Sequence, residues 1–411
     1  MGVTRPHERA ARLPVVVACL LLLGVTGCSD SSSTDASPDS TPASASSPAQ
    51  RPSSSVSPRS GATQGRLDFG PNAVSFIAAD QGWALSPGSC TGCGDLETTA
   101  DAGAHWRLVA KGLKVPGNTR ALVEGRVGMY FTDTNTGYLY TGDRCSTCLL
   151  STRDAGRSWQ PTPLPAVAQL VSSDETTTRS ATATIYALTL RGGPEQRAIY
   201  RRTPDSTAWA RVELPTSVPN LVMAAQGSTI GILATGTHEQ HGRLWVSTDR
   251  GDTWMIRQVP CQSSGTGATL FSLALGHPSA MLIDCFSGEP SQQGQDNGHQ
   301  LYGSTDTGLH WSRLGDPPQT GYTTLLADNG AGHAFLATEG GINHLAATHD
   351  GARHWQMAIT TDQGSFGWAG LRFVNPTTGF IFGPTHYAPE QLYRTLDSGA
   401  TWQRIPLPRP H

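Results

Sequence analysis

From residue 67 to the C-terminus, apolar and polar residues alternate in short runs that are separated by turns rich in Gly, Asp, Ser and Pro. Alternation with a period of two is typical of β-strands that bury one face. Leu221 to Ala225, Ile230 to Ala234 and Arg243 to Val246 are three successive runs, and Trp254 opens a fourth that ends at Pro260. No long helical periodicity competes with this pattern. It predicts an all-β domain built from repeated units of four strands.

A short segment recurs between the third and fourth strands of these units. It has Ser or Thr two positions before an Asp, and Trp five positions after it. We call these segments the Asp turns; the six intact copies contain Asp101, Asp154, Asp249, Asp306, Asp350 and Asp397. Five of them have Gly two positions after the Asp, whereas in the turn of Asp350 the Gly comes one position earlier. A seventh, degraded copy contains Asp205 and shortens the step from Asp to Trp to four positions.

The residue types of the Asp turn suit a tight connection between two strands. The carboxylate and the hydroxyl can accept backbone N–H bonds within the turn, and Gly supplies a positive φ. The Trp then packs between neighbouring sheets. The segment resembles the Asp-box, or BNR repeat, of sialidases, sortilin-type receptors and other β-propellers. A turn that is repeated around a ring maintains the fold, so we assign all seven Asp residues a structural role.

The spacing of the copies predicts the number of blades. From Asp101 to Asp397 the copies follow one another every 49 residues on average, which is about the length of a four-stranded blade. We therefore predict a seven-bladed β-propeller of four-stranded antiparallel blades over residues 67–411. The blade of Asp205 is its least regular member.

A second hairpin pattern occurs three times. Phe76, Phe131 and Phe373 each precede a Gly by six positions, and each Gly is followed by an aromatic residue. This Phe-x5-Gly-aromatic hairpin, followed in its unit by an Asp turn, resembles the propellers of the photosystem II assembly and stability factors. The resemblance implies a protein that holds a client during assembly, and it identifies neither the client nor any binding residue.

Residues 1–27 have the pattern of a lipoprotein signal peptide. Three arginines precede an apolar run from Pro14 to Leu23, which is too short to span a bilayer. The run leads into Val25-Thr26-Gly27-Cys28, which resembles the bacterial lipobox. The resemblance implies cleavage before Cys28 and acylation of that residue. We therefore expect an exported protein that is anchored by a lipid to the outer side of the cell membrane.

Residues 28–66 are predicted to be a disordered tether. Between Ser29 and Arg66 there are 14 Ser and five Pro, and Val56 is the one large apolar residue, so the segment cannot bury a core. A coil of this length would have an end-to-end distance of about 35 Å. Loss of the signal segment takes the formal charge from −3 to −5, which argues against a nucleic-acid partner.

Six cysteines remain in the mature domain: Cys90, Cys93, Cys145, Cys148, Cys261 and Cys285. The first four form two Cys-x-x-Cys motifs, each between the second and third strands of a blade. In a propeller these connections lie on the face opposite the Asp turns, and the last two cysteines map to the same face. An even number of cysteines in an oxidising compartment favours disulfides. We predict a Cys261–Cys285 bridge, with each Cys-x-x-Cys pair closed locally or crossed to its neighbour.

Two other uses of the Cys-x-x-Cys motifs stay open. The four sulfurs of Cys90, Cys93, Cys145 and Cys148 could bind one Zn²⁺ tetrahedrally, although 51 residues is a long spacing and an exported protein is an unusual place for such a site. A thioredoxin-like redox role is disfavoured, because no helix follows either motif to lower the pKa of a thiol. Apart from the zinc alternative, we predict no cofactor.

These features favour a binding or assembly scaffold for a protein or glycan client. The longest insertions on the cysteine-bearing face, residues 236–242 and 287–298, are the expected contacts. The alternative is a sialidase-like glycosidase, which needs an arginine trio, a Tyr–Glu pair and an acid Asp. Sialidases also carry a Phe/Tyr-Arg-x-Pro motif ahead of the first Asp-box, and this chain has none there. We assign no catalytic residue.

The lipobox predicts a simple outcome for Cys28. Cys28→Ala removes the acylated thiol, so the protein should be released from membranes or remain unprocessed. Membrane fractionation and the mass of the mature protein measure this. Unchanged partitioning together with an unchanged mature mass would show that the lipobox reading is wrong.

Overall fold

The computed structural model describes residues 73–408, apart from 118–120, 123–125, 144, 146–147, 173–182, 191–196, 214–220, 235–241, 262–268, 277–278, 288–298, 319–320, 330–331, 340–341, 362–366 and 384–390. The predicted signal peptide, lipidated Cys28 and tether lie outside these residues. So do nearly all residues of the two insertions that were expected to contact a partner.

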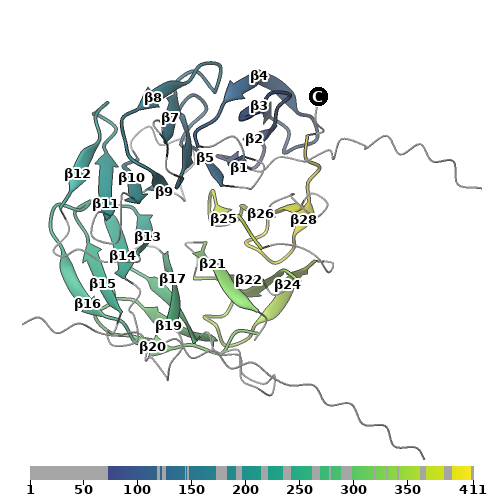
Figure 1. Ribbon diagram of the computed structural model, residues 1–411. Helices are drawn as coiled ribbons and strands as arrows, with labels where there is room; N and C mark the ends of the chain where they lie inside the picture. Colours follow the sequence, from purple (N-terminus) through teal and green to yellow (C-terminus); the bar gives the residue numbers. More distant parts are fainter. Residues whose placement is uncertain are drawn as a thin grey trace, which may run out of the picture. The chain divides into compact units, whose positions relative to one another are not determined.

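The described residues form seven four-stranded antiparallel sheets arranged as blades around one axis (Figure 1). The seven-bladed propeller predicted from the sequence is confirmed. Blade 1 contains β1 (Ala73–Phe76), β2 (Gly82–Pro87), β3 (Cys93–Thr99) and β4 (Arg107–Lys114), and blade 2 contains β5 (Val127–Phe131), β6 (Gly137–Thr141), β7 (Leu149–Thr152) and β8 (Gln160–Thr162). Blade 3 contains β9 (Val167–Ser172), β10 (Ile185–Leu190), β11 (Arg197–Arg202) and β12 (Ala210–Val212), and blade 4 contains β13 (Leu221–Gln226), β14 (Thr229–Ala234), β15 (Arg243–Ser247) and β16 (Met255–Gln258). Blade 5 contains β17 (Thr269–Leu275), β18 (Met281–Ser287), β19 (His299–Ser304) and β20 (Ser312–Arg313). Blade 6 contains β21 (Tyr322–Asp328), β22 (Ala334–Glu339), β23 (His344–Thr348) and β24 (Gln356–Thr360). Blade 7 contains β25 (Gly370–Phe373), β26 (Gly379–Gly383), β27 (Gln391–Thr395) and β28 (Gln403–Arg404).

In the part of the chain that the structure describes, every blade is built from four consecutive strands, and no strand is exchanged between the first and last blades. Blade 7 lies next to blade 1 and closes the ring (Figure 1), and the contacts between the two blades involve side chains. The rings of Phe76 and Phe380 stack at 4.0 Å across this junction. Arg394 donates a hydrogen bond to the carbonyl oxygen of Ala79 at 3.1 Å, and the Trp106 indole donates one to Pro406 O at 3.1 Å.

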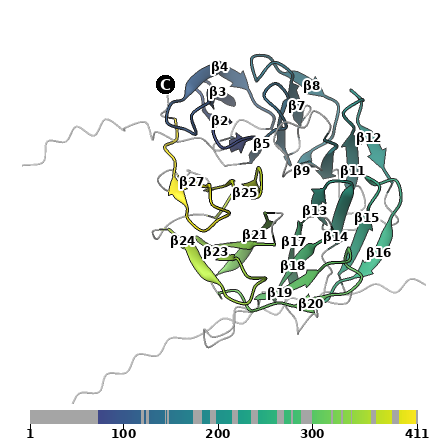
Figure 2. The same cartoon turned by 180° about the vertical axis from the view of Figure 1, so that it is seen from behind.

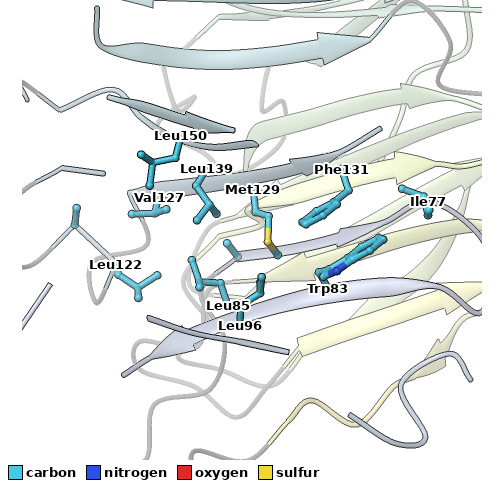
Figure 3. Packing of buried hydrophobic residues seen from close by; sticks show 12 residues of the cluster. Ile77, Trp83, Leu85, Leu96, Leu122, Val127, Met129, Phe131, Leu139 and Leu150 are labelled. Atoms are coloured by element: carbon cyan, nitrogen blue, oxygen red, sulfur yellow. The ribbon is translucent and has the colours of Figure 1, made fainter. Parts of the chain in front are cut away.

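The Phe-x5-Gly hairpins supply the aromatic stacks between blades. Phe76 is the cross-strand partner of Gly82, and a Cβ on that glycine would lie 2.6 Å from the Phe ring. The aromatic residue after the Gly then reaches the next blade: Trp83 stacks on Phe131 at 3.8 Å with the rings parallel within 1° (Figure 3). With Phe380 on Phe76, and Phe335 against Phe373 at 4.5 Å, such contacts join three successive interfaces from blade 6 to blade 2.

The six intact Asp turns share one set of hydrogen bonds. In the first, Thr99 Oγ1 donates to Asp101 at 2.8 Å and accepts the Gly103 N–H at 2.8 Å, while the His105 N–H donates to Asp101 at 2.9 Å. The His105 side chain also contacts this carboxylate, a position that Ser or Thr fills equally well in other copies. The backbone and side-chain bonds from His105 lower the pKa of Asp101 to about 2. Such a carboxyl group carries no proton to donate at neutral pH.

Two successive residues in each turn adopt a positive φ. In the first turn these are Ala102 at 63° and Gly103 at 88°. In the turn of Asp350 the two residue types are exchanged, with Gly351 at 72° and Ala352 at 65°. The Gly that stands one position early in the sequence therefore fills the first of two left-handed positions.

The second left-handed position faces the preceding blade. A Cβ on Gly156 would lie 2.4 Å from Leu96 of blade 1, and one on Gly399 would lie 2.1 Å from Phe335 of blade 6. Where Ala352 holds this position, the preceding blade supplies the glycine instead: a Cβ on Gly315 would lie 1.9 Å from the Ala352 carbonyl oxygen. Each intact turn thus fixes the distance between two blades.

The connection at Asp205 is a different turn. It closes with a hydrogen bond from the Ser206 N–H to Thr203 O at 3.1 Å. Among the described hydrogen bonds, none ends on the Asp205 carboxylate. The described hydrogen bonds therefore do not show at Asp205 the role that we assigned to all seven Asp residues. The shorter step places Trp209 itself four positions after the Asp, where the intact copies have the residue whose N–H the carboxylate accepts.

Two glycine substitutions separate backbone strain from the contact with the preceding blade. Gly399→Ala should lower the free energy of unfolding by roughly 2–4 kcal/mol, from a positive φ together with overpacking on Phe335. Gly351→Ala should change it by less than about 1 kcal/mol, because its Cβ would meet open space and alanine already holds the equivalent position at Ala102. Denaturant unfolding of both variants measures this. Equal losses of unfolding free energy in the two variants would contradict the contact between the second left-handed position and the preceding blade.

Candidate functional site

A cavity of about 900 Å³ runs along the axis of the ring. The first strand of every blade contributes to its wall, so the seven edges that face the axis surround it (Figure 2). Most of the lining side chains are apolar, among them Met223, Leu273 and Leu326. Its size lies within the range of about 300–1,000 Å³ that is typical of ligand pockets.

Polar side chains in the wall link different blades. Gln169 of blade 3 donates to Met223 O at 2.8 Å and accepts the Met223 N–H at 3.2 Å, which satisfies both backbone groups of that edge residue. Arg372 of blade 7 extends to blade 2, where it lies 4.4 Å from the centroid of the Tyr130 ring and donates to Phe131 O at 3.4 Å. These contacts hold the innermost strands at fixed distances from one another.

The two carboxylates in the described wall lie at opposite ends of the cavity. Asp143 follows β6 on the face that carries the cysteines, which we call the cysteine face, and pairs with Arg126 at 2.5 Å. Asp328 is the last residue of β21 and lies toward the Asp-turn face. A strand of this length spans roughly 20 Å. That exceeds the separation of about 5–9.5 Å between the two carboxyl groups of a glycosidase.

Three disulfides occupy the cysteine face. Cys261 and Cys285 are joined with a Cα–Cα distance of 5.4 Å, which ties the connection into blade 5 to β18 of that blade. Cys90 is bonded to Cys93 and Cys145 to Cys148, so each motif is closed locally. Neither the crossed pairing nor the shared zinc site is formed, because each of the four sulfurs is bonded to the other cysteine of its own motif. In the described residues, no group of three or more His, Cys, Asp or Glu is placed to hold a metal.

A buried His–Asp pair links β19 to β18, and sequence reasoning missed it. His299 Nδ1 lies 2.9 Å from Asp284 Oδ2, with both side chains fully buried, and Nε2 lies 3.0 Å from Gly321 O. Both ring nitrogens face acceptors, an arrangement that favours the doubly protonated, charged imidazole. Burial alone would lower the pKa of His299, but Asp284 and the Gly321 carbonyl raise it above 6.5. In the sequence, the one sign of this buried pair is that a charged residue, Asp284, interrupts the apolar run from Met281 to Phe286.

Comparison with known proteins establishes the fold. No family model matches the chain. The structure of YCF48 bound to D1 peptide covers 79% of this chain and 94% of its own, with 17% identity and a TM-score of 0.51. An ancestral GH74 enzyme covers 82% of this chain and 46% of its own, with 14% identity and a TM-score of 0.51. At these identities the shared feature is the propeller.

One curated protein is also similar in sequence. A xyloglucanase from Paenibacillus sp is 27% identical over 179 residues, which are 42% of this chain and 15% of that enzyme. This chain therefore matches a small part of the enzyme's length.

The buried His299 predicts a pH-dependent stability. Because its pKa is raised in the folded state, its contribution is fully present below about pH 6.5, the ordinary value, and is lost as the pH rises through the folded pKa. His299→Gln should lower the free energy of unfolding by about 3 kcal/mol at pH 6 and by less at higher pH.

Unfolding midpoints from pH 5.5 to 9 test this. His105→Gln is the matched control, because that side chain is 89% exposed and should change stability by less than about 0.5 kcal/mol. A constant difference between wild type and His299→Gln over this range would show that folding does not raise the pKa of His299.

Proposed function

We propose that this protein is a lipid-anchored binding scaffold that holds an extended segment of a protein client in its axial cavity, outside the cytoplasm. The observation that carries the proposal is the cavity itself. It has a mainly apolar wall, and Arg126 and Asp143 stand at its mouth on the cysteine face. Such a wall binds apolar side chains, and the polar groups at the mouth fix the orientation of the chain.

The construction of the wall supports a rigid receptor. The contacts of Gln169 and Arg372 between blades hold the innermost strands in place before a client arrives. The disulfides Cys90–Cys93 and Cys145–Cys148 shorten two connections on the face where the cavity opens. Pre-ordered sites lose less conformational entropy on binding, so a moderate number of contacts gives useful affinity.

Similarity to other propellers also favours a peptide ligand. The neighbour bound to D1 peptide shares the fold over 94% of its own chain, whereas the similarity to the GH74 enzyme covers 46% of that enzyme. The predicted acylation of Cys28 and the tether that follows would place the cavity near membrane-bound clients.

The second candidate is a glycosidase, which the sequence similarity to the xyloglucanase favours. The wall offers Asp143 and Asp328 as carboxylates, and these lie at opposite ends of the cavity. Asp143 is also paired with Arg126. This arrangement supports binding better than general acid–base chemistry on a sugar.

Filling the cavity tests the proposal. Ala168 lines the cavity and is exposed, so Ala168→Trp should obstruct it without disturbing the core. Ala400, which is exposed in the last Asp turn, gives the control Ala400→Trp. The client would be captured by cross-linking from solubilised cell envelope and quantified by mass spectrometry. We expect its recovery to fall at least tenfold with Ala168→Trp and to stay unchanged with Ala400→Trp.

Two outcomes would overturn the proposal. Equal recovery of every captured protein with wild type and Ala168→Trp would exclude the cavity as the binding site. Release of reducing ends from xyloglucan by the wild type, lost in Ala168→Trp, would establish the glycosidase instead.

A further inference from the structure

The three disulfides differ in how far their sulfur-bearing residues are exposed. Cys261 and Cys285 are both buried, with exposed fractions of 3% and 5%. Cys93 is equally buried at 3%, but its partner Cys90 is exposed to solvent. Cleavage of a disulfide requires a thiolate to reach one of its sulfurs, so exposure decides which bridge reacts.

We propose that the Cys90–Cys93 bridge is a thiol–disulfide exchange site for protein dithiols, with Cys90 as the sulfur that is attacked. This inference does not depend on the axial cavity. A thiolate of the partner attacks Cys90 Sγ, the bond to Cys93 breaks, and Cys93 leaves as a thiolate. The partner is now joined to Cys90 by a mixed disulfide. The second thiol of the partner attacks the partner sulfur of this disulfide. Cys90 leaves with both electrons of that bond, so the partner gains a disulfide and both cysteines end as thiols.

The surroundings of Cys90 leave its sulfur uncovered. The turn between the two cysteines consists of Thr91 and Gly92, which have small side chains. On the neighbouring strand β4 the facing residue is Gly112, where even an added Cβ would lie 3.9 Å from Cys90 Sγ. A larger residue at position 112 would cover the sulfur. Cys90 is thus exposed, and the residue that faces it has no side chain.

Strand β4, which pairs with the strand of Cys93, carries two lysines and also bonds the buried carboxylate of Asp95. Lys114 is the cross-strand partner of Cys93, and Lys111 precedes Gly112; both lysines are exposed. Cationic side chains near a thiol favour the thiolate, which is the form that leaves and the form that attacks.

The fold keeps the two cysteines together after the bond is broken. The Cys93 N–H donates to Cys90 O at 3.1 Å, and the Gly88 N–H donates to Cys93 O at 2.8 Å. The Gly112 N–H donates to the buried carboxylate of Asp95 at 2.7 Å, which fixes β4 independently of the disulfide. Since the Cα atoms are 5.3 Å apart, the reduced pair remains in position to be oxidised again.

The rates of reduction test the proposal directly. The full chain would be treated with reduced glutathione under native conditions, quenched by alkylation and mapped by mass spectrometry. We expect Cys90–Cys93 to be reduced at least tenfold faster than Cys261–Cys285 and the glutathione adduct to form on Cys90. Equal rates, or an adduct on Cys93 alone, would overturn the proposal.

Single variants identify the attacked sulfur. Cys93→Ala should accumulate a mixed disulfide with glutathione on Cys90, whereas Cys90→Ala should leave the buried Cys93 unmodified. Ala400→Trp, at an exposed position outside both sites, should leave the wild-type reduction rate unchanged. If either cysteine variant fails to fold, the wild-type rates still decide the question.

The exchange activity needs a protein substrate. Reduced, unfolded ribonuclease A supplies dithiols, and the wild type should oxidise it in a stoichiometric burst of one disulfide per chain, which Cys90→Ala and Cys93→Ala should both lack. Absence of the burst in the wild type, with Cys90–Cys93 oxidised at the start, would contradict the activity.

Discussion

The ring has to close without a shared strand, and the rest of the structure depends on that closure. Because no backbone ladder joins blade 7 to blade 1, side-chain packing provides the junction. Flat aromatic stacks such as Phe76 on Phe380 bury large apolar areas at a fixed spacing, and the glycine beneath each Phe makes room for the ring. The Asp turns add a second fixed spacing farther from the axis. Aromatic contacts of this kind occur in succession on both sides of the point where the two ends of the ring meet.

The two faces of the ring then serve different purposes. On one face a single turn is repeated with the same hydrogen bonds, and its low-pKa carboxylates act as acceptors that organise the backbone. On the other face the connections differ from blade to blade, and three disulfides together with the His299–Asp284 pair hold them. A uniform face maintains geometry, while a varied face on the same rigid frame can recognise a partner.

The axial cavity and the exposed disulfide are consequences of the same rigidity. Seven innermost strands at fixed distances leave an enclosed space with a constant shape, which suits a bound segment. The strand β4 fixes Cys90 and Cys93 by backbone bonds that remain when their disulfide is broken. A protein that holds a client beside such a bridge could oxidise the client's thiols while holding it.

The sequence by itself determined the class of fold, the number of blades and the position of the repeated turn, because these follow from local rules. Alternation defines each strand, and the hydroxyl, carboxylate and Gly of an Asp turn bond to one another within eight residues. Even the early Gly351 obeys a local requirement, since both residues after the Asp need a positive φ. Asp205 departs from the pattern because one missing residue removes the bonding geometry.

Tertiary structure alone decided which distant residues meet. Arg372 contacts Phe131 across 241 positions of the chain, and the meeting point depends on the radius of the closed ring. The raised pKa of His299 depends on acceptors from two other segments, and the reactivity that we propose for Cys90 depends on a glycine of the neighbouring strand. The cavity is likewise a property of seven blades together. A one-dimensional pattern carries no information about these distances, because they are set by packing between blades.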